Sequence, residues 1–236
     1  MPERSWRILL DQSFRTAAEQ MALDVRLAHE TQLSVRVFQW SRSAISLGWK
    51  QPVPPWVHIP SWRAAGIERV ERPTGGGIAL HGSDVSVSVV VPRVLGIPLP
   101  SLMRAVGESA VRLCESYQAD AHLLLDVEAQ ERITYCLTES SPYAVMSHGR
   151  KVAGFALRRY PESWLIQGSL LVEPLAPALL NAMPDEMRDQ LAKRAVALSG
   201  ASEEQMTIAS VMRRWAERWN AWWMTAQRES AGAAVD

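Results

Sequence analysis

Two side chains capable of nucleophilic and acid–base chemistry lie in one segment of the sequence. Cys136 ends a predicted strand, and Lys151 follows a predicted hairpin turn later in that segment. A thiolate is a strong nucleophile and a neighbouring ammonium lowers a thiol pKa, so Cys136 could act as a nucleophile. On position alone, a buried inert thiol and a solvated turn lysine are the more ordinary interpretations.

A glycine-rich loop, RPTGGG, begins at Arg72 and lies between two predicted strands. Gly75, Gly76 and Gly77 lack side chains, so backbone N–H groups there can approach a phosphate, a carboxylate or a thioester carbonyl. Arg72 could pair with an anion, although a tight hairpin loop is equally compatible with the pattern. The loop matches neither the Walker pattern nor the dinucleotide fingerprint. His81, a few residues later, is by itself more often a structural histidine than a base.

Regular elements must position these segments. Apolar spacing predicts helices at residues 13–29, 61–65, 101–117 and 207–227. Alternating or continuous apolar runs predict strands at residues 33–40, 43–47, 67–71, 85–91, 121–126, 132–136, 143–147, 150–158 and 164–172. Prolines divide the chain after these strands into short helical pieces.

The order of the elements indicates an α+β fold, because strands are frequent without strict alternation with helices. We expect mixed sheets flanked by helices, with a catalytic core at residues 1–175 and a C-terminal helical extension at 176–236 packed on it. The apolar stripe of the last helix is expected to pack onto the sheet. That stripe includes Trp215, Trp219, Trp222 and Trp223.

Composition limits the class of protein. The chain has 236 residues, 47% of them hydrophobic, which is enough for one ordinary core. Lys and Arg total 25, as do Asp and Glu, so the zero net charge gives no support to nucleic-acid binding. Cys114 and Cys136 indicate free thiols in a reducing compartment. We expect a cytoplasmic protein with no signal peptide and no membrane span.

Two segments together resemble those of a known family. RPTGGGIALH, beginning at Arg72, resembles the arginine–glycine loop and histidine of lipoate-protein ligases and octanoyltransferases. GRKVAGFALRR, beginning at Gly149, resembles their lysine motif, and ISLGWKQP and QGSLLV resemble flanking segments. The resemblance covers roughly residues 6–172. It implies the mixed-sheet fold shared by biotin ligases and the catalytic cores of class II synthetases.

Within this family, the residues leading to the lysine resemble the cysteine-dependent octanoyltransferases. The matching positions are Cys136, Ser141, Pro142, Tyr143 and Lys151. The resemblance implies that Cys136 takes an octanoyl or lipoyl group from a thioester, while Lys151 lowers the thiol pKa and stabilises the oxyanion. It further implies octanoyl-acyl carrier protein as donor, a lipoyl domain or glycine-cleavage H-like protein as acceptor, and neither cofactor nor bound metal.

The resemblance also implies a set of residues that bind the substrate. These are Arg72, Gly75, Gly76, Gly77, His81, Gly154, Phe155 and Ala156. In a strand, Gly154 lets a ligand or another backbone approach closely. Phe155 stands where the family has a small serine, and it could narrow the acyl tunnel.

Three alternatives stay open. An ATP-dependent lipoate-protein ligase would use ATP and Mg, hold phosphate or adenylate in the glycine loop, and leave Cys136 incidental. A non-catalytic relative would hold lipoate or a carrier domain without turnover, and the departures at Gly82 and Phe155 motivate it. A biotin ligase agrees less well, because its Gly-Arg-Gly-Arg loop is absent from the sequence.

Overall fold

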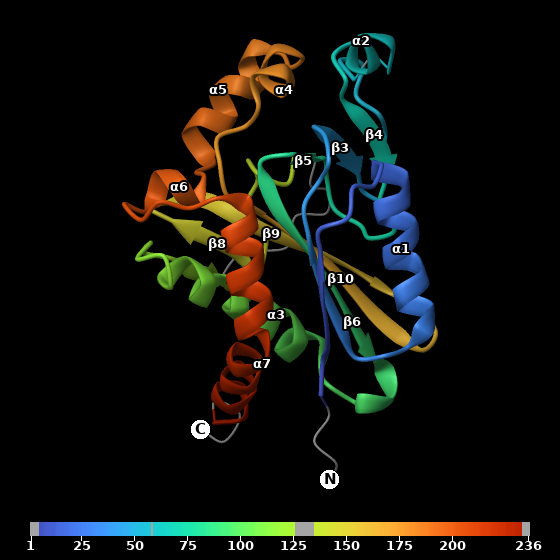
Figure 1. Cartoon of the computed structure of the whole chain (residues 1–236), viewed down its shortest axis with the longest axis vertical. Coiled ribbons are helices and arrows are strands. Elements are labelled where there is room, and N and C mark those ends of the chain that lie inside the picture. The colour runs from blue at the N-terminus through green and yellow to red at the C-terminus, as the bar shows by residue number, and fades with distance from the viewer. Residues whose placement is uncertain (1–4, 58, 126–134, 233–236) are drawn as a thin grey trace.

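The computed structural model describes residues 5–57, 59–125 and 135–232 (Figure 1). A seven-stranded sheet has the order β1-β2-β6-β10-β9-β8-β7, and a three-stranded sheet has the order β4-β3-β5. The β1–β2 and β3–β4 pairs are parallel and the other strand pairs are antiparallel. Both sheets are therefore mixed.

The elements have the following bounds. The large sheet comprises β1 (Arg7–Asp11), β2 (Ser34–Phe38), β6 (Asp84–Pro92), β7 (His122–Leu124), β8 (Ala144–Ser147), β9 (Arg150–Arg159) and β10 (Ser163–Leu171). The small sheet comprises β3 (Ala44–Leu47), β4 (Glu68–Glu71) and β5 (Ala79–His81). The helices are α1 (Ala17–Glu30), α2 (Ile59–Ala64), α3 (Leu99–Glu115), α4 (Pro177–Asn181), α5 (Asp185–Arg194), α6 (Leu198–Ala201) and α7 (Ile208–Gly232), with a 3-10 turn at Arg93–Leu95.

Helices cover the large sheet on both faces. α3 and α7 pack against each other on one face, and α1 lies across β6 and β10 on the other (Figure 1). The main apolar core fills the space between the sheet and the α3–α7 pair. The expected tryptophan stripe is confirmed there, because Trp215, Trp219 and Trp223 of α7 are buried in this core. The boundary at residue 175 stays a prediction, since α7 shares its core with the strands before it.

The other face of the large sheet is buried but polar at its centre. Ser88 on β6 lies between Arg36 on β2 and Gln167 on β10 in the strand register. Arg36 forms an ion pair with Asp24 of α1 at 2.7 Å, and Gln167 donates to the same carboxylate at 2.6 Å. Buried charges need such partners. α1 therefore supplies the partner for Arg36 and Gln167 on the polar face that it covers, and this face becomes the floor of the site.

Most predicted elements are confirmed within a few residues, with specific differences. Helix α1 begins at Ala17 rather than at residue 13, because Thr16 and Glu19 form a capping box. β1 was not predicted; it is a short edge strand that pairs with β2. His81 ends β5 of the small sheet, whereas the sequence placed it near the start of the long strand.

The prediction that a strand at residues 132–136 ends with Cys136 is wrong. Residues 132–134 lie outside the described residues, Tyr135 forms an isolated bridge with Ile78, and Cys136 lies in a turn. Among the described residues, no helix is both long and apolar enough to cross a bilayer.

The α7 stripe should carry much of the stability of the fold. We expect Trp215→Ala to lower the free energy of unfolding by about 3–5 kcal/mol, because the fully buried ring leaves a cavity between α7 and α3. Urea unfolding followed by circular dichroism measures this. The matched control is Phe14→Ala, whose aromatic ring is 87% exposed and whose loss should change stability by less than about 0.5 kcal/mol. Equal effects of the two variants would contradict the assignment of the core.

Candidate active site

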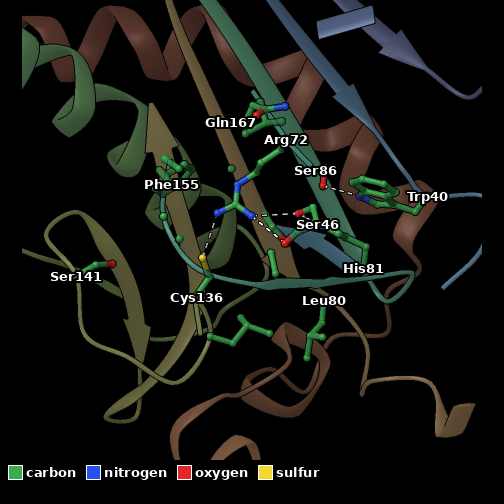
Figure 2. A pocket seen from close by; sticks show the side chains of 18 of the residues that line it. Trp40, Ser46, Arg72, Leu80, His81, Ser86, Cys136, Ser141, Phe155 and Gln167 are labelled. Carbon is green, nitrogen blue, oxygen red and sulfur yellow. Dashed lines mark hydrogen bonds between the residues drawn. The ribbon is translucent and has the colours of Figure 1, made fainter. Parts of the chain in front are cut away.

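A cavity lies between the polar face of the large sheet, the small sheet and the glycine loop (Figure 2). Most of the predicted site residues line it: Arg72, Gly76, His81, Cys136, Lys151, Gly154, Phe155 and Ala156. Gly75 lines an adjoining cavity, which shares Gly76, Phe155 and Ala156 with the first. Gly77 contributes its carbonyl, which accepts a hydrogen bond from Arg72 at 2.7 Å. The fold thus brings the glycine-rich loop together with the segment that carries Cys136 and Lys151.

Cys136 is held against the chain that leaves the glycine loop. Its backbone N–H donates to the carbonyl of Ile78 at 2.9 Å, beside the Ile78–Tyr135 bridge. Its side chain is half-buried, and the Sγ atom lies 3.5 Å from Nη2 of Arg72. The thiol is therefore within reach of a ligand in the cavity and beside a permanent positive charge.

Lys151 reaches the cavity because of a bulge in β9. Opposite Val145 and Met146 of β8, the partners on β9 are Ala153 and Lys151, so one extra residue stands between them. Strict alternation would place Lys151 on the same face as Ala153, toward the α3–α7 core. The bulge turns it to the other face, because an extra residue reverses the direction of the side chains that follow.

Gly154 provides the space for the Lys151 side chain. A Cβ atom at Gly154 would lie 3.1 Å from Cε and 3.3 Å from Nζ of Lys151. The ammonium donates to the carbonyl of Glu139 and to Oγ of Ser141, both at 3.0 Å. Gly154 thus accommodates the lysine, and it also lines the cavity, with the carbonyl oxygen of Cys136 3.9 Å from the Cβ position. The expected approach of a ligand there stays a prediction.

The electrostatics of Lys151 are those of a buried amine. The residue is only 3% exposed, and burial lowers its pKa from the ordinary value of 10.5, although the nearby charges of Cys136 and Glu139 act in the opposite direction. Desolvation disfavours the charged form of an amine. Lys151 can therefore release a proton more readily than a lysine in solvent.

Arg72 binds the glycine loop. Nη2 donates to the carbonyls of Gly75 and Gly77 at 2.8 and 2.7 Å, and Nη1 donates to the carbonyl of Ser46 at 3.0 Å. Gly48 packs so closely on this loop that a Cβ atom there would lie 1.9 Å from the Gly76 carbonyl oxygen. These hydrogen bonds set the shape of the loop, and the expected pairing of Arg72 with an anion stays a prediction.

His81 belongs to a hydrogen-bonded network that the sequence did not reveal. Its Nδ1 lies 2.9 Å from Oδ2 of Asp84, and its Nε2 lies 2.8 Å from Oγ of Ser46. The ring of Trp40 stacks on the imidazole with centroids 4.0 Å apart, and the indole N–H donates to Ser86. The polar alternation at the start of the long strand could have indicated Asp84 and Ser86, since those side chains share one face.

Phe155 lies over a glycine on the neighbouring strand. It is paired in register with Gly168, where a Cβ atom would lie 2.3 Å from Cδ1 of the phenyl ring. The ring thus occupies the place of the missing side chain, next to Val87. It lines both cavities, as Gly76, Ser141 and Ala156 also do.

The chain is similar to known proteins of one family. A model of the family described as the lipoyl protein ligase A/B catalytic domain matches residues 14–220. The chain belongs to this family. An octanoyltransferase LipM of Kyrpidia tusciae is 32% identical over 206 residues, which are 80% of this chain and 74% of that protein. A second octanoyltransferase LipM, from Symbiobacterium thermophilum, is 30% identical over 196 residues, or 77% and 70% of the two chains.

Solved structures of the family share the fold. Lipoate-protein ligase A bound with ATP has a TM-score of 0.72 at 17% identity, covering 95% of this chain and 93% of that one. A putative lipoate protein ligase from T. acidophilum with bound lipoic acid has a TM-score of 0.70 at 16% identity, with the same coverage. Biotin protein ligase from Aquifex aeolicus has a TM-score of 0.52 at 13% identity, covering 97% and 73%. The predicted α+β, biotin/lipoate ligase-like fold is confirmed, and the chain is an enzyme of this transferase and ligase family.

The buried ammonium of Lys151 should make stability depend on pH. Its pKa is lower in the folded state than in the unfolded state, so the unfolded state binds more protons between the lowered value and 10.5. The wild type therefore loses stability as the pH falls through that window. We expect Lys151→Met to become more stable relative to the wild type as the pH falls from 10.5 toward neutrality.

Urea unfolding at a series of pH values tests this expectation. Lys193→Met is the matched control, because Lys193 is exposed and its replacement should give a difference that stays flat with pH. A Lys151→Met difference as flat as that of the control would contradict the burial of the ammonium.

Proposed function

We propose that the chain is an acyltransferase that moves an octanoyl or lipoyl group to a lysine of a lipoyl-carrier domain through a Cys136 thioester. The observation that carries the proposal is the position of the Cys136 thiol in a cavity with two buried cationic side chains, Arg72 and Lys151. The names of the octanoyltransferase relatives support the same activity. The substrates follow from the chemistry of the site and from those relatives.

The first half-reaction is thioester exchange. The Cys136 thiolate attacks the carbonyl carbon of an octanoyl thioester on an acyl carrier protein, and a new C–S bond forms. The C–S bond to the carrier thiol breaks, and that thiolate leaves and takes up a proton. Exchange of one thioester for another is nearly balanced in energy, so the step needs an activated nucleophile rather than ATP.

The second half-reaction is aminolysis. The neutral amine of a lysine on a lipoyl domain, or on a glycine-cleavage H-like protein, attacks the acyl carbon, and a C–N bond forms as the C–S bond to Cys136 breaks. Lys151 is placed to accept the proton that the attacking nitrogen loses, because burial lowers its pKa. The hydrogen bonds from Lys151 to Glu139 and Ser141 keep its Nζ beside the cysteine turn.

The acyl chain requires apolar walls beside the thiol. Such side chains come from α1, β2, β5, β6 and the chain around the cysteine: Met21, Phe38, Leu80, Val87 and Leu137. The floor between the strands carries only small side chains at Gly154, Ala156 and Ser169, which leaves room for a chain of methylene groups. Burial of each methylene contributes about 0.8 kcal/mol.

An ATP-dependent ligase agrees less well with the hydrogen-bond donors that the cavity offers. A triphosphate and Mg need free N–H donors and unengaged cations. Both terminal nitrogens of Arg72 already donate to carbonyls of the loop and of β3. Lys151 likewise donates within the cysteine turn. We therefore place the transferase first and make the ligase and the non-catalytic relative outcomes of one experiment.

Intact mass spectrometry tests the proposed acyl-enzyme. We expect purified protein incubated with octanoyl-acyl carrier protein, without ATP, to gain one octanoyl group and to pass it to an added lipoyl domain. Cys136→Ala should abolish the adduct. Cys114→Ala is the matched control and should keep it, because Cys114 is buried and burial raises its thiol pKa to about 12.

Other outcomes discriminate the alternatives. Absence of an adduct on the wild type would overturn the transferase. Modification of a lipoyl domain by free lipoate with Mg and ATP, surviving in Cys136→Ala, would establish the ligase. Tight lipoate or carrier binding with no mass change under either condition would establish a binding protein.

Phe155 should limit the length of the acyl chain. Its ring is the largest side chain that lines both cavities, so Phe155→Ala should enlarge the space beside the thiol and admit longer chains. We expect the ratio of dodecanoyl to octanoyl transfer to rise about tenfold, measured with the two carrier thioesters in competition. Leu157→Ala is the control, since Leu157 lies two residues further along β9 and lines the second cavity but not the first. An unchanged ratio in Phe155→Ala would remove Phe155 from chain-length selection.

A further inference from the structure

The strongest unexplained feature of the site is a buried guanidinium without a carboxylate partner. Arg72 is 6% exposed, and its hydrogen-bond acceptors are the carbonyls of Ser46, Gly75 and Gly77, the hydroxyl of Ser46 and the sulfur of Cys136. Within the described residues, none of the ion pairs includes Arg72. A buried charge with only neutral partners favours an anion beside it.

The sulfur of Cys136 is the group in position to become that anion. Nη2 of Arg72 carries two hydrogens, which are shared among the carbonyls of Gly75 and Gly77 and the Sγ atom at 3.5 Å. Figure 2 shows the guanidinium between Ser46 and Cys136. An arginine stays protonated throughout the range in which a thiol titrates, so its charge is constant.

On the side away from Cys136, a series of buried hydrogen bonds holds the Arg72 guanidinium. Nη1 of Arg72 donates to Oγ of Ser46 at 3.2 Å, and this oxygen lies 2.8 Å from Nε2 of His81. Nδ1 of His81 lies 2.9 Å from the carboxylate of Asp84. One assignment of hydrogens satisfies every member: Ser46 donates to Nε2, and Nδ1–H donates to Asp84.

The series of hydrogen bonds that begins at Arg72 ends at the carboxylate of Asp84. Oδ2 of Asp84 accepts from Ser86 at 2.9 Å and from Ser169 at 2.6 Å, and Oδ1 accepts from the Gly82 N–H at 3.0 Å. Burial alone would raise the pKa of Asp84, but the neighbouring His81 and the hydrogen bonds from Ser169 and Gly82 outweigh burial and hold it below its ordinary value. The carboxylate therefore stays ionised and fixes the imidazole.

We propose that Arg72 is the cation that stabilises the Cys136 thiolate, and that Ser46, His81 and Asp84 are positioning residues that hold its guanidinium against the sulfur. Lys151 and, beyond it, Glu139 are the other charged groups near the thiol. Arg72 and Lys151 have different roles because their charges behave differently. Arg72 supplies a constant charge, whereas Lys151 can exchange a proton. The inference deepens the proposed function, but it concerns the thiol alone and does not require an acyl substrate.

The pH dependence of thiol alkylation tests it. Iodoacetamide reacts with the thiolate, so the rate at Cys136, followed by peptide mass mapping, reports the thiol pKa. We expect Arg72→Gln to slow the reaction at neutral pH at least about tenfold, because less of the thiol is thiolate, with the rates converging at alkaline pH. Arg72→Lys, which keeps a charge, should fall between the two.

Two further variants separate direct pairing from structural damage. Arg158→Gln is the matched control, because Arg158 donates to the Pro73 carbonyl of the same loop without touching the sulfur, and its profile should follow the wild type. Ser46→Ala removes the link between His81 and Arg72, and it should shift the profile in the same direction by a smaller amount.

The outcomes are distinct. A wild-type alkylation profile in Arg72→Gln would overturn the pairing of Arg72 with the thiolate. If Arg72→Gln does not fold, a wild-type profile in both Arg72→Lys and Ser46→Ala would overturn it instead. An unchanged Ser46→Ala profile beside a shifted Arg72→Gln profile would overturn the positioning chain. Failure of the acyl-enzyme experiment with a shifted Arg72→Gln profile would instead remove the proposed function and leave this inference standing.

Discussion

The site depends on the burial of the Arg72 guanidinium. This one side chain donates to β3 through Ser46, to the glycine loop through Gly75 and Gly77, and to the sulfur of Cys136. These groups come from segments that are distant in the sequence. A planar fork of fixed N–H donors can satisfy several acceptors at set angles, which a lysine cannot do. The small sheet, the glycine loop and the Cys136 turn therefore meet at a single group.

The large sheet has two chemically different faces, and only one of them carries the polar groups of the site. One face is apolar and packs under α3 and α7, which supplies the stability of the domain. The other is lined by hydroxyls, an amide and small residues, and its charges are paired through α1 and Asp84. Buried polar groups are costly unless every one is satisfied. A buried face whose charged groups are paired beside a cavity is thus a feature of binding and catalysis more than of stability.

Several parts of the site could be predicted from the sequence because they depend on local patterns. The glycines of the loop, the lysine after a hairpin turn and the tryptophan stripe of α7 are all visible as short-range signals. The position of Cys136 in a turn was not predicted, since its segment also had a strand pattern. Asp84 and Ser46 were missed because nothing in their own segments indicates that β3 and β6 meet at His81.

The sequence by itself determined the family, the α+β class and the two constellations, because composition, order of elements and motif spacing belong to the chain. Only the tertiary structure decided which way the chemistry-bearing side chains point. A bulge opposite β8 turns Lys151 into the cavity, although alternation alone would direct it to the apolar core. The acceptors around Arg72 come from β3, the loop and the cysteine turn, so that pairing exists only once the two sheets lie side by side. Long-range contacts of this kind leave no periodic trace in the sequence.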